Sequence, residues 1–221
     1  MSSFPSLSGP VDVPADAAFA LVCLHGFGDV GQSWLQVLSL MKAGLPQAFS
    51  SRLALFCPNG PDATPFGEGR QWFSDNNWTF RDPPGLKRAA GLLEDYLTRV
   101  VSGEHQIPRE RIILMGFSQG AMTTLYAVPR LNPPVAGFIS LAGRMMDTVK
   151  PDPVSLTPTL FLHGYDDDVL PSDTTVEAEA RYAEWGMPTE LHILEGLGHG
   201  ANAQALAHVA GFVQRVLNNA G

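Results

Sequence analysis

Short apolar segments rich in β-branched and aromatic residues alternate along the chain with stretches of helical length, and this alternation limits the folds open to the sequence. Six segments have the length and composition of buried strands: 19–24, 53–57, 111–115, 135–141, 159–162 and 191–194. Five stretches repeat apolar residues at three- and four-residue spacing: 33–42, 86–101, 119–128, 173–185 and 201–218. Strands alternating with helices predict an α/β fold, with a mainly parallel sheet covered by helices on both faces.

The length of 221 residues fits one domain with one sizeable core. Its hydrophobic share of 45% and charged share of 16% are those of an ordinary globular protein. We therefore expect a single domain over residues 1–221, without a large lid domain. Residues 59–85 form the longest segment without helical or strand periodicity, and they are rich in aromatic side chains. Long loops of this kind in compact domains are often functional.

Charge and hydropathy exclude several classes of partner. The net charge is −8, and no run of Lys or Arg forms the basic patch that a phosphate backbone requires, so we expect no nucleic-acid partner. No segment approaches the uninterrupted apolar length of a membrane span, and the first residues lack a basic stretch followed by an apolar one. We expect a cytoplasmic protein without stable membrane insertion. Cys23 and Cys57 lie in strand-like runs and are expected to be core residues.

The most informative local motif is Gly116-Phe-Ser-Gln-Gly120, which follows a predicted strand and precedes a predicted helix. A serine hydroxyl is a weak nucleophile, so it must project from a sharp turn toward a base, and flanking glycines let other backbone segments approach it. A strand, a tight turn and a helix in this order favour Ser118 as the nucleophile of an α/β-hydrolase fold. The alternative is a glycine-rich turn with a solvated serine.

The α/β-hydrolase fold places its acid and its base after the nucleophile, in loops that follow later strands. Asp166, Asp167 and Asp168 follow the predicted strand 159–162, and His199 follows the strand 191–194. Both positions are at carboxyl ends of strands, where ligands bind in open α/β sheets. His199 is therefore the predicted base, and chemistry alone does not choose among the three aspartates.

The other five histidines fit the role of base less well. One lies within a strand, one within the last helix and one in a polar connection, namely His192, His208 and His105. His25 and His163 end strands, but both precede the candidate acid along the chain, and such residues more often brace their loops by hydrogen bonding.

An oxyanion requires two preorganised N–H donors, usually one on the residue after the nucleophile and one in the loop after an earlier strand. Gln119 is the first candidate. Phe27 is the second, because the glycines of Leu24-His-Gly-Phe-Gly-Asp29 suit a backbone amide turned inward. An ordinary glycine-rich turn is the alternative for this loop.

With these motifs in place, the sequence resembles the phospholipase/carboxylesterase family of small α/β-hydrolases, which is related to acyl-protein thioesterases. The resemblance spans nearly the whole chain and is carried by the segments 24–29, 57–61, 69–74, 116–121, 163–169 and 198–199. The family places its acid four residues after the His of a His-Gly pair, which carries over to Asp167, and its oxyanion amides at Phe27 and Gln119. Asp168 stands where proline is common, and Ser74 where thioesterase relatives often carry aspartate.

The resemblance implies hydrolysis of carboxylic esters, of short to medium acyl chains, through an acyl-Ser118 intermediate and without a metal or organic cofactor. Acyl-protein thioesterase or lysophospholipase-type activity is the main alternative, with a lipidated protein as a possible partner. Apolar residues near the proposed site are candidates for an acyl groove or, alternatively, for the core: Phe66, Trp72, Phe73, Met145, Met146, Leu170 and Leu197. A non-catalytic binding protein on a hydrolase scaffold is the alternative from a different class.

Overall fold

The computed structural model describes residues 6–65, 67–74 and 85–219. Their centre is a seven-stranded sheet in the order β1-β3-β2-β6-β7-β8-β9, in which only β1 runs antiparallel to its neighbour. The strands are β1 Val11–Asp12, β2 Phe19–Leu24, β3 Leu53–Phe56, β6 Ile112–Phe117, β7 Gly137–Leu141, β8 Thr159–Gly164 and β9 Thr189–Leu194. All six predicted strands are confirmed, with shifts of a few residues at their ends.

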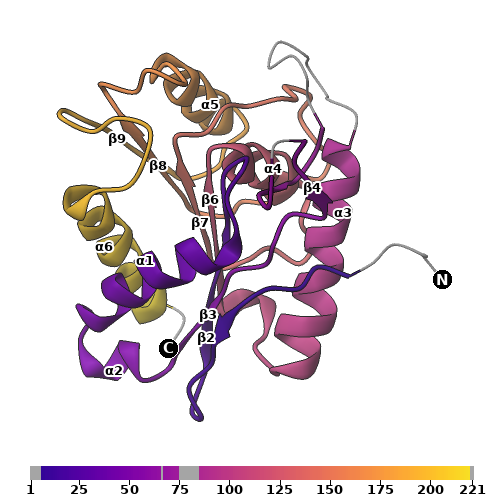
Figure 1. The fold of residues 1–221 in the computed structure, drawn as a ribbon, viewed down its shortest axis with the longest axis vertical. Helices are drawn as coiled ribbons and strands as arrows, with labels where there is room; N and C mark the ends of the chain where they lie inside the picture. Colours follow the sequence, from indigo (N-terminus) through magenta and orange to yellow (C-terminus); the bar gives the residue numbers. More distant parts are fainter. Residues whose placement is uncertain (1–5, 66, 75–84, 220–221) are drawn as a thin grey trace.

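Helices cover both faces of the sheet, as predicted (Figure 1). They are α1 Gly31–Ala43, α3 Leu86–Tyr96, α4 Gln119–Ala127, α5 Asp173–Glu184 and α6 Ala203–Asn219, with a short α2 at Gln47–Ser50. Helices α3, α4 and α5 pack on one face, and α1 and α6 pack on the other. No helix in the described part of the chain is long and apolar enough to cross a membrane.

Alternate side chains of each strand supply the two halves of the core. On β2, Ala20, Val22 and Leu24 pack toward α3 and α4, whereas Leu21 and Cys23 pack toward α1 and α6. The strand is buried on both faces, which explains why its sequence is a continuous apolar run and not an alternating one.

Three features were not predicted from the sequence. A two-stranded ribbon, β4 Asp62–Ala63 with β5 Arg70–Gln71, gives structure to part of the aromatic loop. The predicted helix 86–101 is α-helical to Tyr96 and continues as a wider π-helical stretch, Leu97–Glu104. Strand β1 adds to the sheet edge beside β3.

Candidate active site

Ser118 lies in the turn between β6 and α4, where the backbone has the strained torsion angles φ 51° and ψ −116°. The two glycines of the motif are required by close packing. A Cβ atom on Gly116 would lie 2.6 Å from the Cα of Ala121, and one on Gly120 would lie 2.2 Å from the carbonyl oxygen of Leu24. The turn is thus fixed on both sides, and it holds a serine side chain that is 8% exposed.

Three of the sequence-predicted side chains meet at the carboxyl ends of the strands. The Oγ of Ser118 lies 3.0 Å from Nε2 of His199, and Nδ1 of His199 lies 2.6 Å from Oδ2 of Asp167. His199 reaches this position from the connection between β9 and α6. With a neutral ring, Nδ1–H donates to the carboxylate, and Nε2 accepts the serine proton.

The three consecutive aspartates differ in burial and in hydrogen bonding. The Asp167 side chain is buried, and its Oδ1 accepts hydrogen bonds from the backbone N–H groups of Val169 and Leu170 at 2.9 and 2.8 Å. Burial raises the pKa of Asp167, but the bonds from these amides and from His199 outweigh it and hold the pKa below its usual value. Asp166 and Asp168 are exposed. Only Asp167 of the three contacts the imidazole.

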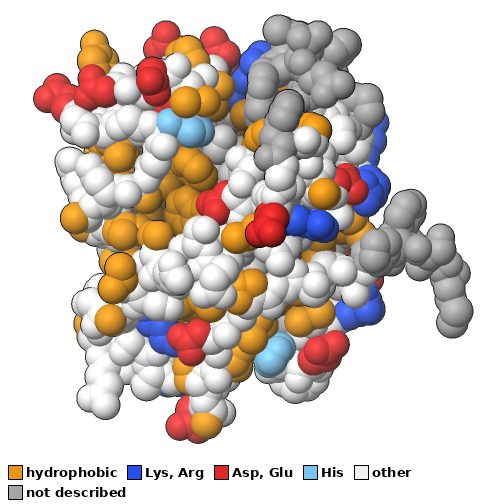
Figure 2. All heavy atoms as spheres, viewed as in Figure 1, with side chains coloured by type: hydrophobic (Ala, Val, Ile, Leu, Met, Phe, Trp, Pro, Cys, Tyr) orange, Lys and Arg blue, Asp and Glu red, His pale blue; other side chains and the backbone are white. Residues whose placement is uncertain are grey.

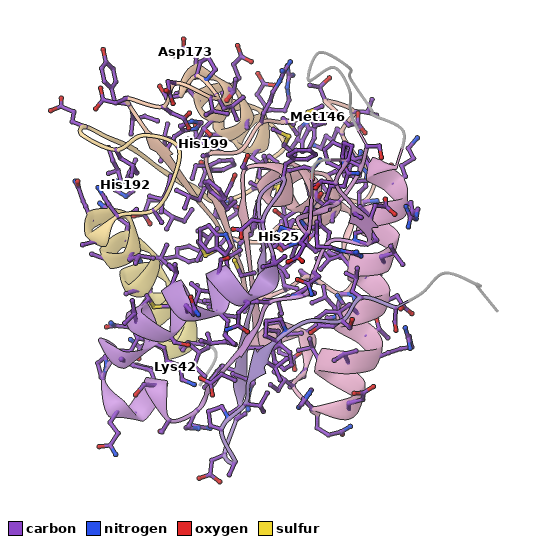
Figure 3. All side chains as sticks on the ribbon, in the orientation of Figure 1. His25, Lys42, Met146, Asp173, His192 and His199 are labelled. Atoms are coloured by element: carbon purple, nitrogen blue, oxygen red, sulfur yellow. The ribbon has the colours of Figure 1, made fainter. Side chains whose placement is uncertain are left out.

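His25 and His163 form hydrogen bonds at the ends of their strands, and they do so differently. Nδ1 of His25 lies 2.7 Å from the Gly26 carbonyl oxygen, and its Nε2 accepts from the Gly60 amide at 2.9 Å. His163 instead contacts Asp167, at 3.0 Å. Sequence order argues against His163 as the base, and no local sequence pattern indicates its contact with the acid. Figure 3 labels His25 near the centre of the molecule and His199 closer to the strand ends.

The two predicted oxyanion residues belong to backbone segments that flank Ser118. Gly26 packs against the nucleophile turn, since a Cβ atom there would lie 3.4 Å from Cβ of Ser118. The His25 bond to the Gly26 carbonyl fixes the peptide plane that carries the Phe27 amide. Gln119 is the first residue of α4, where backbone N–H groups favour developing negative charge.

The side chain of Gln119 makes two hydrogen bonds that sequence analysis missed. Its Oε1 accepts from the Trp72 backbone amide at 2.9 Å, and its Nε2 donates to the Phe73 carbonyl at 2.8 Å. Trp72 Nε1 also donates to the His25 carbonyl at 2.8 Å. Trp72 and Phe73 are almost completely buried, so the structure places these two predicted substrate-binding residues beneath the surface.

The other predicted substrate-binding residues differ in exposure. Met145 and Leu170 are partly buried at the margin of the core, and Leu197 is buried against Leu194. Phe66 lies outside the described residues.

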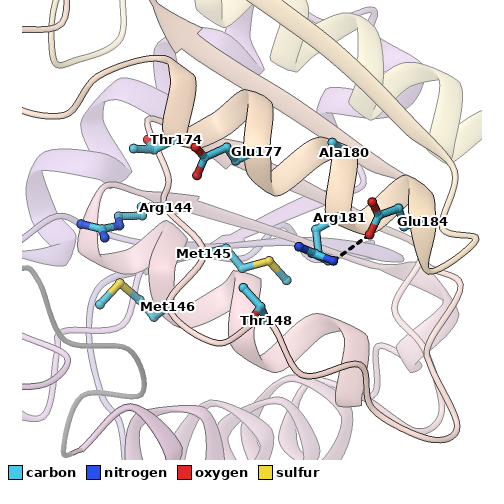
Figure 4. Close-up of a pocket in the computed structure, with 9 residues that line it drawn as sticks. All are labelled: Arg144, Met145, Met146, Thr148, Thr174, Glu177, Ala180, Arg181 and Glu184. Atoms are coloured by element: carbon cyan, nitrogen blue, oxygen red, sulfur yellow. Dashed lines mark hydrogen bonds and ion pairs between the residues drawn. The ribbon is translucent and has the colours of Figure 1, made fainter.

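A cavity of about 330 Å³ lies between the connection after β7 and helix α5 (Figure 4). Met145 and Met146 give it an apolar wall, and charged side chains of α5 stand opposite, including the ion pair between Arg181 and Glu184 at 2.7 Å. Mixed apolar and charged walls of this kind suit an amphipathic group.

An apolar hollow opens between the carboxyl ends of the strands and helices α1 and α6, with acidic side chains above it (Figure 2). Phe117, which sequence analysis did not single out, is partly buried between Trp34 and His199, with ring centroids 5.1 and 5.0 Å apart. Across the described ranges, no group of three or more His, Cys, Asp or Glu side chains could hold a metal ion.

Comparisons with known proteins find relatives that cover most of the chain. Acyl-protein thioesterase 1 homolog 1 of Dictyostelium discoideum is 27% identical over 204 residues, covering 87% of this chain and 88% of that protein. Acyl-protein thioesterase 1 of Eremothecium gossypii is 26% identical over 226 residues, covering 96% and 95%. The crystal structure of esterase PE8 superposes with a TM-score of 0.85 at 27% identity, covering 96% of this chain and 100% of that one.

A family model described as phospholipase/carboxylesterase matches residues 11–217. The match covers all seven strands of the sheet and the segments that carry Ser118, Asp167 and His199. The chain therefore belongs to the phospholipase/carboxylesterase family of ester and thioester hydrolases.

Proposed function

We propose that the chain is a serine carboxylesterase that hydrolyses carboxylic esters of short to medium acyl chains through an acyl-Ser118 intermediate. The observation that carries this proposal is the unbroken series of hydrogen bonds from Ser118 Oγ through the His199 ring to Asp167. A series of this kind supplies a weak nucleophile with a base that is held in one orientation.

In the acylation step, Ser118 Oγ attacks the carbonyl carbon of the ester while its proton passes to Nε2 of His199. The oxyanion that forms accepts hydrogen bonds from the backbone amides of Phe27 and Gln119. When the intermediate collapses, the bond to the alcohol oxygen breaks, and the alcohol leaves with the proton from His199. Water then attacks the acyl carbon while its proton passes to Nε2 of His199. The bond between the acyl carbon and Ser118 Oγ breaks, the carboxylic acid leaves, and His199 returns the proton to Oγ.

Asp167 acts on this cycle through the imidazole. Its carboxylate stays ionised at neutral pH because its hydrogen bonds hold its pKa below the usual value in spite of burial. The charge keeps Nδ1 of His199 protonated, so that Nε2 faces Ser118 as an acceptor, and it stabilises the imidazolium formed during each proton transfer.

For the acyl chain we propose apolar residues around the strand ends, where parallel-sheet proteins bind ligands. The proposed lining consists of Met145, Leu170 and Leu197. Phe66 remains a candidate from the sequence alone, and the candidates Trp72 and Phe73 are buried. The Phe117 ring packs against His199 with centroids 5.0 Å apart, and the apolar hollow seen in Figure 2 offers further room for an acyl chain.

Thioester hydrolysis is the second candidate, because relatives that cover most of the chain are named acyl-protein thioesterases. The same groups would act, with a thiol in place of the alcohol as leaving group. In this case the acyl chain comes attached to a protein, and the enzyme contacts a lipidated segment of that partner.

The test is hydrolysis of p-nitrophenyl acetate, butyrate, octanoate and palmitate by wild type and by Ser118→Ala. We expect activity that is lost in the variant and that is highest with butyrate or octanoate. An optimum at palmitate, or activity confined to an S-acylated peptide, would move the assignment to the thioesterase or lysophospholipase alternative.

A fluorophosphonate probe separates an enzyme from a binding protein on the same scaffold. We expect wild type to be labelled covalently and Ser118→Ala to stay unlabelled, because the probe reacts with an activated serine. Absence of labelling in a folded wild-type protein would favour the non-catalytic alternative.

A further inference from the structure

Asp167 contacts a second histidine besides His199. His163, at the end of β8, is fully buried, and its Nε2 lies 3.0 Å from Oδ2 of Asp167 and 2.9 Å from the Leu170 carbonyl oxygen. On the other side of the ring, Nδ1 lies 2.6 Å from Oγ1 of Thr175, in the first turn of α5. Both ring nitrogens therefore have polar partners in the interior.

These partners determine which nitrogen of His163 carries the proton. Nε2 faces a carboxylate and a carbonyl, which only accept, so it must donate. Burial lowers the pKa of His163, and its bonds to Leu170 and Asp167 do not offset this, so the ring is neutral and Nδ1 is an acceptor. The Thr175 hydroxyl also donates to the Gly143 carbonyl oxygen at 2.9 Å, so its single proton is shared between this oxygen and Nδ1 at 2.6 Å.

We propose that His163 is a positioning residue for Asp167, and that the two acceptors facing Nε2, the Asp167 carboxylate and the Leu170 carbonyl, set its tautomer. The inference rests on the proposed function, since Asp167 acts only through His199. Two imidazoles donate to the same oxygen, Oδ2 of Asp167, at 3.0 and 2.6 Å. The bond from His163 prevents the carboxylate from rotating away when His199 moves during proton transfer.

The surrounding backbone supports this arrangement. Oδ1 of Asp167 is held by two amides of residues 169–170, so both carboxylate oxygens have donors. A Cβ atom on Gly164 would lie 2.0 Å from the carbonyl of Leu197, and the Asp166 amide donates to that same carbonyl at 3.0 Å. The end of β8 and the loop that carries His199 are therefore packed together, and His163 fixes the acid between them.

The hydrogen bond from His163 also offsets part of the negative charge that Asp167 presents to His199. The charged and titratable groups that face the ring are Asp167 and His199, and its remaining polar partners are the Leu170 carbonyl and the Thr175 hydroxyl. Without the donor, more of the carboxylate charge stabilises the His199 imidazolium. The acidic limb of the kcat/KM profile should then move to higher pH.

The experiment compares His163→Gln with His163→Met, which have similar length and differ in that only glutamine carries an N–H donor. We expect His163→Met to lower kcat/KM for p-nitrophenyl butyrate about ten- to hundredfold, as for one hydrogen bond to a charged group. Its acidic limb should move up by about half a pH unit or more. His163→Gln should recover most of the rate and the wild-type limb. Equal losses in both variants with an unmoved limb would overturn the proposal, because they would show a packing role alone.

A second measurement does not depend on activity, and its main readout comes from the wild-type protein. In ¹H–¹⁵N spectra of histidine-labelled wild type, we expect His163 to be protonated on Nε2 alone between about pH 5 and pH 8. In Thr175→Val, the loss of the donor to Nδ1 should shift this signal. A proton on Nδ1 in wild type, alone or with Nε2, refutes the assignment. Failure of the proposed function would be recognised separately, because the Ser118→Ala variant would then keep the activity of the wild type.

Discussion

Replacing Asp167 with asparagine changes one carboxylate oxygen into an NH₂ group within an almost isosteric side chain. The oxygen that remains is held at the Oδ1 position by the amides of Val169 and Leu170. The NH₂ group then takes the place of Oδ2, where it faces the protonated Nδ1 of His199 at 2.6 Å. Two donors cannot bond to each other, so the imidazole must adopt the other tautomer.

The size of the effect follows from the wrong tautomer. With the proton on Nε2, His199 presents a donor to Ser118 Oγ, 3.0 Å away, and no longer accepts its proton. In serine hydrolases with the same arrangement, this change lowers kcat about 10⁴-fold, or about 5.5 kcal/mol in transition-state free energy. Because the Asp167 site is buried, water does not substitute for the missing acceptor, and we expect a loss of about 10³- to 10⁴-fold in kcat.

The assay is kcat for p-nitrophenyl butyrate, with Asp166→Asn and Asp168→Asn as matched controls. Asp168 is exposed, and the carboxylate of the exposed Asp166 accepts a hydrogen bond from the Gly196 amide at 2.8 Å. Each control should change kcat by about twofold or less, as for ordinary surface substitutions. Equal effects at all three positions, or a loss of only a few fold in Asp167→Asn, would refute the tautomer argument.

Three further predictions concern stability and reactivity. Gly120→Ala should lower the free energy of unfolding by about 1–3 kcal/mol in urea titrations, because its Cβ would clash with a β2 carbonyl oxygen. Gly91→Ala, on the exposed side of α3, should instead raise the free energy of unfolding by about 0.5–1 kcal/mol. Both cysteines should resist a thiol reagent until the chain is unfolded, because they are buried and burial raises the pKa of Cys57 to about 12. Despite burial, hydrogen bonds hold the pKa of Asp167 below its ordinary value, so its stabilisation is complete above about pH 4 and is lost as pH falls through the folded-state value. The unfolding free energy of wild type should therefore decline more steeply in acid than that of Asp167→Asn.

Much of the fold was predictable because the signal is periodic. Buried strands such as 19–24 appear as continuous apolar runs, and amphipathic helices such as 203–219 repeat apolar residues at helical spacing. The positions of Ser118 and His199 followed from the order of motifs and the rule that loops at strand ends form sites. The ribbon of 62–63 with 70–71 was missed, since two-residue strands carry no periodicity.

The internal hydrogen bonds of the site were not predictable in the same way. Gln119 was selected for its backbone amide, yet its side chain also holds residues 72 and 73, which lie 47 and 46 positions away along the chain. Trp72 and Phe73 looked like groove residues because they are aromatic and lie in a long loop. Their burial depends on partners that no local pattern identifies.

The three consecutive aspartates show where sequence reasoning from chemistry ends and geometry begins. Asp166, Asp167 and Asp168 have the same functional group, so composition cannot rank them. The turn after β8 ranks them, because it aims the amides of residues 169 and 170 at one carboxylate and leaves the other two in solvent. The motif spacing selects the same residue because four positions separate Asp167 from His163, and this spacing brings its carboxylate to both histidines. A one-residue insertion between His163 and Asp167 should therefore abolish the hydrogen bond to His163 and the hydrogen bond to His199 together.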